Sequence, residues 1–387
     1  MTAEFVCILA AAAAFFTAVG TVVPVIPHYV AGPLHGGGPA IGFATGAFFL
    51  GTLVARPIAG RISDAQGRRV AVAGGAAVMA VAIATFGAAH NLAALIALRS
   101  LQGVGDGAFY VGAVTAATDM VSPGSRGRAV SYFSVAVYAG LASGPPLGEF
   151  LLHRAGYTSV WAAAAALAAV AAVLAVRLPG KPRGLPAGRG RLVHPAGLVP
   201  GVVFGLGTFG YGAFASFMPL YALTLGLHGS APVFGIYAGC IVVGRLSGAR
   251  IPDRCGPFAT ARAGLVAIAA GFVVLGAVPT VLALCLGTAM FAMGSAFLLP
   301  SVLSLALEAA PEGDRAAVIG TVVAFFDIGQ GAGAAASGPA VAAAGYATPF
   351  CCGALAALGG LTVLGRYRRA NPGSAPPALS LPKTELN

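Results

Sequence analysis

The amino-acid sequence predicts an all-α membrane protein with twelve transmembrane helices in two pseudo-symmetric halves. Only 9% of the 387 residues are charged and 58% are hydrophobic, whereas a soluble domain carries about 25% charged residues. The apolar runs are long and lack the alternation of a β-barrel strand, and a spanning helix needs about 20 apolar residues. Composition and run length therefore predict helical spans.

A faint internal repeat predicts the two halves. Adding 189 to the residue number carries scarce charged residues onto counterparts: Arg56 to Arg245, Arg61 to Arg250, Asp64 to Asp253, Asp119 to Glu308 and Arg126 to Arg315. A duplication of this kind in a hydrophobic chain is typical of two-halved transporters.

The apolar runs place the helices in order along the chain. We expect the first six at about 5–30, 39–60, 70–89, 91–118, 129–152 and 157–178. The second six follow at about 197–224, 231–251, 258–279, 281–308, 316–343 and 347–366. The expected organisation is a six-helix bundle over 1–178, a cytoplasmic linker over 179–196, a second bundle over 197–369 and a disordered cytoplasmic tail over 370–387. The linker and the tail are rich in Pro and polar residues, which disfavour a packed core.

The basic residues predict the orientation. Lys and Arg collect in alternate loops, which places both termini in the cytoplasm. This placement accounts for the net charge of +11 without a nucleic-acid partner. No phosphate-binding loop, catalytic triad or metal-ligand spacing is visible, so we expect no enzyme activity, metal or cofactor. The expected location is a cell membrane, and the Ala-, Gly- and Arg-rich composition is compatible with a high-GC bacterium.

A charged motif follows the second predicted helix: Gly60-Arg-Ile-Ser-Asp-Ala-Gln-Gly-Arg-Arg69. It resembles the signature loop of the major facilitator superfamily, and a degenerate copy, Arg250-Ile-Pro-Asp-Arg-Cys-Gly256, follows the eighth helix. The resemblance covers essentially the whole chain and implies the fold of that superfamily. It also implies a cytoplasmic latch formed by Gly60, Asp64, Gly67, Arg68 and Asp253. In the latch, Asp64 would hold the N-terminal end of the eleventh helix; the alternative is that these charges only set the topology.

The fourth helix carries a polar stripe. Arg99, Gln102, Asp106 and Tyr110 stand at i, i+3, i+7 and i+11, near one face. The segment resembles the Arg-x-x-Gln-Gly-x-Gly motif of proton-coupled members of the superfamily. A charge within the membrane is costly and needs a partner or a wet cavity. Arg99 and Asp106 are two turns apart, about 10 Å, which favours electrostatic coupling over a direct ion pair. Asp106 is either a proton or substrate site or a structural carboxylate satisfied by hydroxyl groups.

The fifth helix contains Gly140, Gly144, Pro145 and Gly148, followed by Glu149. These residues resemble the antiporter motif of drug and metabolite exporters, in which a glycine stands where this chain has Glu149. The resemblance implies export in exchange for protons. Glu149 is either a proton-entry group or the partner of the neighbouring His153 or Arg154.

Asp327 lies midway along the eleventh helix, and its counterpart in the 189-residue register is Tyr138. Both are expected at the interface of the repeats, where such transporters bind substrate. With Arg99, the carboxyl groups of Asp106 and Asp327 are the candidates for proton coupling, because charged carboxylates are disfavoured outside water. The candidate cavity residues are Gln102, Tyr110, Tyr138, Tyr211, Phe214 and Gln330.

Together these features predict a proton-driven exporter of small amphipathic or hydrophobic compounds, such as drugs or metabolites, that works by alternating access as a monomer. One alternative is a proton symporter or facilitator for a sugar or another nutrient. The chain has few of the amide and acidic side chains that a sugar site needs. A second alternative is a transporter-like receptor without turnover, which would have less reason to retain charges in the membrane.

Overall fold

The computed structural model describes residues 2–122, 125–178, 193–247, 255–311 and 314–370. Within these ranges all regular secondary structure is helical. Nine of the described helices are long and apolar enough to cross a membrane. These observations confirm the all-α membrane fold class, whereas the count of twelve spans stays a prediction.

The helices up to residue 178 follow the predicted order. They are α1 (Ala3–Val22), α2 (Val25–Ala31), α3 (Gly38–Gln66), α4 (Arg68–Ala84), the short 3-10 helix η1 (Phe86–Ala88), α5 (Leu92–Asp119) and α6 (Arg126–Val176). The break between α1 and α2 falls at Pro24, which has no backbone N–H to continue the helical ladder. Gly156, with φ 75°, divides α6 into two helical segments, close to the predicted boundary between the fifth and sixth spans.

The helices after residue 193 are α7 (Pro195–Thr224), α8 (Ala231–Ser247), α10 (Pro257–Ala277), α11 (Val281–Glu308), α12 (Arg315–Ala344) and α13 (Thr348–Ala370). Residues 179–192 and 371–387 are not described, so most of the predicted linker and tail lies outside the described residues. Asp253, a predicted latch residue, also lies outside them.

The 189-residue register recurs in the helix boundaries. Helices α4, α5 and α6 begin at residues 68, 92 and 126, and α10, α11 and α12 begin at 257, 281 and 315. The caps match as well, because Asn91 caps α5 and Thr280 caps α11 with a side-chain oxygen that accepts a backbone N–H. Gly67 and Gly256 both have positive φ, 99° and 81°, in the turns that follow α3 and precede α10. The pseudo-symmetry thus extends to individual caps and turns.

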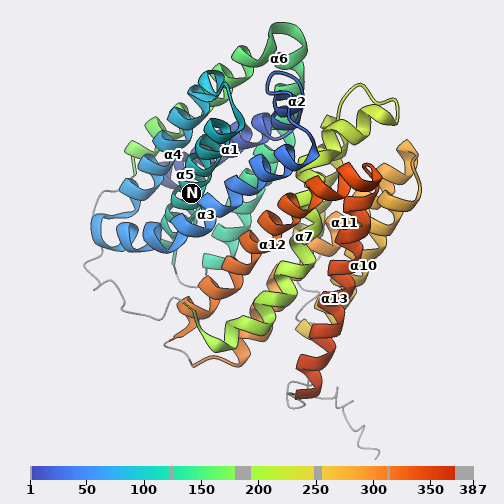
Figure 1. Cartoon of the computed structure of the whole chain (residues 1–387). Helices are drawn as coiled ribbons and strands as arrows, with labels where there is room; N and C mark the ends of the chain where they lie inside the picture. Colours follow the sequence, from blue (N-terminus) through green and yellow to red (C-terminus); the bar gives the residue numbers. More distant parts are fainter. Residues whose placement is uncertain (1, 123–124, 179–192, 248–254, 312–313, 371–387) are drawn as a thin grey trace, which may run out of the picture.

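Buried apolar side chains form two large clusters. The first consists of residues up to Leu178, together with Phe217. The second consists of residues from Val203 to Leu364. Figure 1 shows the blue to green helices beside the yellow to red helices, with α3 alongside α12 between them. Helix α6 packs against α8 in the same way. In the 189-residue register α3 corresponds to α8 and α6 to α12, so the α3–α12 and α6–α8 contacts are pseudo-equivalent.

Candidate functional site

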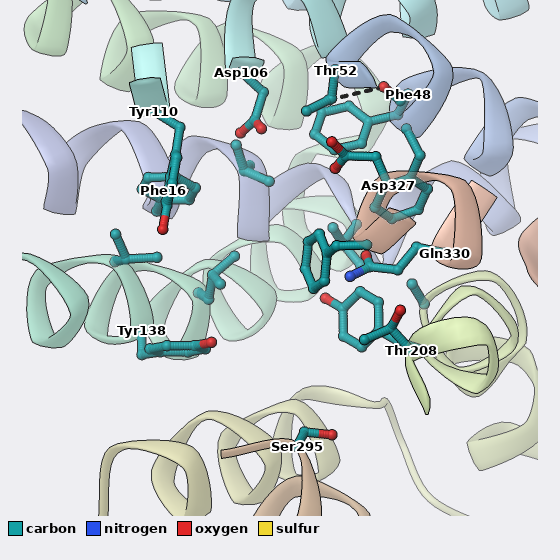
Figure 2. Close-up of a pocket in the computed structure, with 18 of the residues that line it drawn as sticks. Phe16, Phe48, Thr52, Asp106, Tyr110, Tyr138, Thr208, Ser295, Asp327 and Gln330 are labelled. Atoms are coloured by element: carbon teal, nitrogen blue, oxygen red, sulfur yellow. Dashed lines mark hydrogen bonds between the residues drawn. The ribbon is translucent and has the colours of Figure 1, made fainter. Parts of the chain in front are cut away.

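A cavity of about 230 Å³ lies between the helices of the two halves. Helices α1, α2, α3, α5 and α6 line it from one side, and α7, α8, α11 and α12 line it from the other. Most of the lining is apolar or aromatic, and five of the lining residues are charged: Arg56, Arg99, Asp106, Arg245 and Asp327. Figure 2 shows the carboxylates of Asp106 and Asp327 approaching the pocket from α5 and α12.

An ion pair connects the two halves at this cavity. The Nε of Arg56 on α3 lies 2.7 Å from Oδ2 of Asp327 on α12. Nη2 of the same guanidinium donates a hydrogen bond to Oδ1 of Asp327 over 3.2 Å. The Asp327 side chain is 1% exposed and that of Arg56 is 15% exposed. Asp327, predicted as a coupling residue, therefore has a partner that the sequence did not assign to it.

Asp106 has no such partner. It is buried and lines the cavity, and it makes no hydrogen bond or ion pair with any residue in the described part of the chain. A carboxyl group in this position can exchange a proton or accept a ligand donor without first breaking a protein contact.

Arg99 is held by neutral partners. Its Nε donates to the carbonyl oxygen of Ala44 over 3.2 Å, and Nη1 donates to Oε1 of Gln102. The guanidinium also stacks on the ring of Phe48, 4.9 Å from its centroid. Gln102 is fully buried against Arg99 and does not line the cavity. The predicted polar stripe is thus a positioned arginine followed, nearer the middle of α5, by a free carboxylate.

Aromatic side chains line the cavity from both halves. Tyr138 and Tyr211, both predicted as cavity residues, line it, as do Tyr110 and Gln330. Phe214 instead lies behind Tyr211, where it packs on Tyr237 and Phe291 at ring-centroid distances of 5.5 Å and 5.6 Å. These rings offer apolar contact and stacking to a ligand.

Two arginines of the cavity were not among the predicted site residues. Arg56 and Arg245 belong to the internal repeat, and both fall inside predicted spans rather than in loops. That position is a usable signal, because a guanidinium within a span lines a cavity or has a partner. What the sequence could not provide is the pairing of Arg56 with Asp327, which are 271 residues apart.

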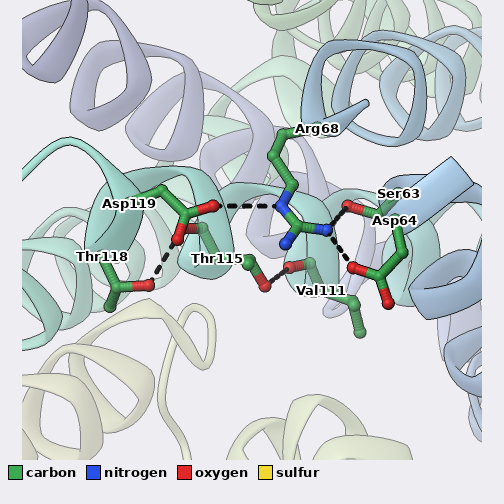
Figure 3. Close-up of polar contacts among 7 residues, drawn as sticks. All are labelled: Ser63, Asp64, Arg68, Val111, Thr115, Thr118 and Asp119. Carbon is green, nitrogen blue, oxygen red and sulfur yellow. Dashed lines mark hydrogen bonds and ion pairs between the residues drawn. The ribbon is translucent and has the colours of Figure 1, made fainter. Parts of the chain in front are cut away.

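The predicted latch residues that the structure describes, Gly60, Asp64, Gly67 and Arg68, lie at one end of the bundle, which we call the Arg68 end. Arg68 bonds to Ser63 and Asp64 at the end of α3, and its Nε lies 3.2 Å from Oδ2 of Asp119 at the end of α5 (Figure 3). Asp64 makes this contact within the first half rather than with the start of α12. Gly60 lies in open surroundings, where an added Cβ atom would meet nothing within 4 Å.

The opposite end, which we call the Glu149 end, is tightly packed. Glu149 of α6 accepts hydrogen bonds from the backbone N–H and the hydroxyl of Ser230, each 2.6 Å, and from the N–H of Ala231 at 3.1 Å. The carboxylate therefore caps the N-terminus of α8, a favourable place for negative charge. The expected pairing with the side chain of His153 or Arg154 is wrong, since a helix end of the other half supplies better donors. His153 contacts only the backbone oxygen of Glu149.

Glycines bring the helices together at the Glu149 end. A Cβ atom on Gly38 of α3 would lie 2.7 Å from the carbonyl oxygen of Gly338 on α12, and one on Gly42 would overlap the carbonyl oxygen of Ala334. Within α6, Gly140, Gly144 and Gly148 of the predicted antiporter motif all face α1, against the segment from Ala13 to Thr21. The motif thus fixes the α1–α6 contact, which borders the cavity.

Replacing Glu149 with glutamine is expected to loosen the Glu149 end. The amide retains one acceptor oxygen where the carboxylate satisfies three donors, at a cost of about 1–3 kcal/mol. We expect faster labelling of a cysteine introduced at Ile26, which lines the cavity, by a membrane-impermeant maleimide added on the Glu149 side. The measurement uses a background without the native cysteines, and Glu4→Gln, at an exposed site, is the control. An unchanged labelling rate would show that this carboxylate does not hold the end closed.

Comparison with known proteins gives a consistent result. A family model described as the Major Facilitator Superfamily matches residues 8–334. An uncharacterised MFS-type transporter of Salmonella typhimurium is 27% identical over 361 residues, covering 90% of this chain and 92% of the relative. A second uncharacterised MFS-type transporter, from Burkholderia mallei, is 26% identical over 361 residues, covering 90% and 88%.

Solved structures of similar fold include three transporters. A human organic anion transporter has a TM-score of 0.71 at 18% identity, with 94% of this chain and 100% of that chain covered. An auto-inhibited peptide transporter of the POT family has a TM-score of 0.76 at 13% identity, with 95% and 97% covered. A nucleoside transporter has a TM-score of 0.74 at 13% identity, with 95% and 99% covered. At these identities the similarity concerns the fold alone.

Proposed function

The chain belongs to the major facilitator superfamily and is a multi-pass membrane transporter, and from this premise we propose that it exports small amphipathic or hydrophobic compounds in exchange for protons. The observation that carries the proposal is the pair of buried carboxylates in one cavity between the halves. Asp327 is held by Arg56 across the α3–α12 interface, whereas Asp106 is open to the cavity. A site that binds either a proton or a substrate group, but not both, couples proton entry to substrate exit.

The Arg56–Asp327 ion pair links protonation of Asp327 to the conformation of the protein. Proton transfer to Asp327 removes the charge that holds Arg56, and a buried ion pair that loses one charge is strongly weakened. Since Arg56 and Asp327 lie on different halves, this loss acts on the interface that must open and close during alternating access. Asp106 then serves as the carboxylate at which substrate and proton compete. The positive charge of Arg56, and to a smaller extent that of Arg99, lowers the electrostatic cost of a charge on Asp106.

The predicted orientation assigns the Arg68 end to the cytoplasm. On this assignment the structure is the conformation closed to the outside, with the Glu149 end sealed by α3, α12 and the Glu149–Ser230 contact. Asp64 would engage the start of α12 only in the opposite conformation, as the latch hypothesis requires. The protein would act as a monomer in a bacterial plasma membrane with both termini cytoplasmic, and the organisation into bundles over 1–178 and 197–369 is part of the same proposal.

The mainly apolar cavity favours amphipathic compounds over sugars. Its polar side chains besides the charged ones are mainly hydroxyls, and Gln330 is the one amide among the lining residues that the structure describes. A sugar symporter or facilitator remains the second candidate, and a receptor without turnover is the third. Both alternatives predict that no added compound causes protons to leave an acidic vesicle interior through the protein.

The test uses proteoliposomes with an acidic interior and a trapped pH-sensitive dye. We expect a compound of a panel of drugs, dyes, sugars and secreted metabolites to alkalinise the interior only when the protein is present. We further expect Asp106→Asn to reduce this signal at least about 100-fold, because an amide cannot take up a proton. Glu4→Gln, a carboxylate substitution at an exposed site, should leave it unchanged. A full signal from Asp106→Asn would remove Asp106 from the coupling mechanism, and substrate movement without any proton flux would favour a facilitator.

A further inference from the structure

Two pseudo-equivalent arginines of the cavity have different surroundings. Arg56 on α3 and Arg245 on α8 are 189 residues apart, and so are Tyr138 on α6 and Asp327 on α12. All four side chains line the cavity. Helix α3 packs against α12 as α8 packs against α6. The Arg56–Asp327 contact and the Arg245–Tyr138 contact are therefore related by the internal repeat.

Arg245 has an aromatic ring where Arg56 has a carboxylate. Its guanidinium lies over the ring of Tyr138, 5.2 Å from the centroid, and Nη1 donates to Oγ of Ser134 over 3.3 Å. Its Nε is buried without a hydrogen-bond partner, and no carboxylate forms an ion pair with Arg245 within the described ranges. A guanidinium inside a membrane span needs an anionic partner or a wet cavity. The carboxylate of a ligand in the cavity would be such a partner for Arg245.

Asp106 is the complementary unpaired group. Its carboxylate faces the same cavity and makes no ion pair with any described residue. Arg99, the nearest arginine along the chain, stands seven residues away on α5 and is occupied by Ala44, Gln102 and Phe48. The cavity thus presents one guanidinium and one carboxyl group that form no ion pair with any described residue, whereas Arg56 and Asp327 pair with each other.

Aromatic side chains line the same cavity as Arg245 and Asp106. The rings of Tyr211 and Tyr237 lie 5.3 Å apart, and that of Tyr237 lies 5.1 Å from Phe291. All three residues line the cavity and supply an apolar surface suited to a planar group. A ligand that satisfies the whole cavity carries both charges and an aromatic or apolar body.

We propose that the substrate is a small amphipathic zwitterion, whose carboxylate pairs with Arg245 and whose ammonium group pairs with Asp106. This assignment rests on the proposed exchange function and gives it a substrate class. The carboxylate of the ligand takes the position that Asp327 fills for Arg56, and a planar carboxylate suits the donor fork of a guanidinium. The ammonium group displaces the proton from Asp106, so binding and proton release are the same event.

A matched set of four probes tests the assignment on the purified full-length protein in nanodiscs. 2-Naphthylalanine carries both charges, its amide only the cation, its N-acetyl derivative only the anion, and the N-acetyl amide neither. We expect the zwitterion to bind at least about 30-fold more tightly than each singly charged probe, because truncating a buried charged partner has an effect of this size. Comparable affinity for all four, or no binding of the zwitterion, would overturn the assignment.

Three variants identify the two charges. In Arg245→Gln the zwitterion should bind no better than the amide, and in Asp106→Asn no better than the N-acetyl derivative. Tyr138→Asp places a carboxylate beside Arg245, as Asp327 is placed beside Arg56, and should also remove the preference for a ligand carboxylate. Arg154→Gln, an arginine that stacks on Phe150 outside the cavity lining, is the matched control. Thermal unfolding without ligand establishes that each variant is folded. A carboxylate preference that survives in both folded Arg245→Gln and Tyr138→Asp would overturn the role of Arg245.

Proton release separates this inference from the proposed function. Binding is measured at equilibrium without a pH gradient, so it reports the substrate class alone. In weakly buffered solution with a pH indicator, the zwitterion should release protons from the wild-type protein and not from Asp106→Asn. Zwitterion preference without proton release would refute exchange and support the substrate class. Proton-coupled transport of neutral or singly charged compounds, without zwitterion preference, would do the reverse.

Discussion

Asp327→Asn is expected to abolish proton-driven transport and to destabilise the protein. The substitution leaves the Arg56 guanidinium without its only ion-pair partner among the described residues, in a setting where Asp327 is 1% exposed. Breaking a buried ion pair by removing one charge costs about 3–5 kcal/mol. Substrate-dependent proton flux in proteoliposomes should fall to the level of empty vesicles, and thermal unfolding of the detergent-solubilised protein should begin at a lower temperature.

A double variant distinguishes lost coupling from lost stability. Arg56→Gln combined with Asp327→Asn replaces the ion pair by two amides and should recover much of the stability, since no uncompensated charge remains. It should not recover proton-driven transport, because the exchangeable carboxyl is still missing. Full proton-coupled transport by either Asp327→Asn protein would exclude Asp327 from the coupling mechanism, and equal stability of the single and double variants would mean that the pair contributes little to the fold.

Gly42→Leu is expected to prevent closure of the Glu149 end and to slow transport at least about tenfold. A Cβ atom at this position overlaps the carbonyl oxygen of Ala334 on α12, a backbone atom that cannot move aside. Overpacking of a close contact costs about 1–3 kcal/mol, enough to shift a two-state equilibrium about 5- to 150-fold. The measurement uses a cysteine introduced in place of Ile26. In Gly42→Leu this cysteine should react with an impermeant maleimide added on the Glu149 side much faster than in the parent protein.

The matched control is Gly74→Leu. Gly74 also lies within a long helix, α4, and an added Cβ atom there would meet nothing within 4 Å. The parent labelling rate and transport rate should persist in this variant. If Gly42→Leu transported at the parent rate, the tight α3–α12 contact would not be part of the transport cycle. If both variants were slow, the effect would come from helix substitution in general.

Local sequence determines the elements to a large extent. The predicted span at about 91–118 corresponds to α5 (Leu92–Asp119), and that at about 281–308 to α11 (Val281–Glu308). Both begin after a side chain that caps a helix and end near a charged residue, which are signals readable without an alignment. The span at about 231–251 is harder to delimit, because α8 is described only as far as Ser247.

The sequence predicted the carboxylates of the candidate site, but it did not predict which side chains pair with them or cover their neighbours. Asp106 and Asp327 are conspicuous because charge inside an apolar run is costly, and both line the cavity. Gln102 and Phe214 share helix faces with cavity residues but are covered, Gln102 by Arg99 and Phe214 by neighbouring rings. Helical spacing predicts the face of the helix on which a residue lies. It does not predict whether another side chain separates that residue from the cavity.

The sequence by itself determined that this chain is a helical membrane protein with an internal repeat, because these properties depend on composition and on spacing along one chain. Only the tertiary structure decided that Arg56 pairs with Asp327, that Glu149 caps α8, and that Arg245 and Asp106 form no ion pair with any residue that the structure describes. Such pairings join residues far apart in sequence, and they depend on how two helices are placed against each other. A charge in the sequence states only that a partner is needed, and the packing of the two halves determines whether the protein or a ligand provides it.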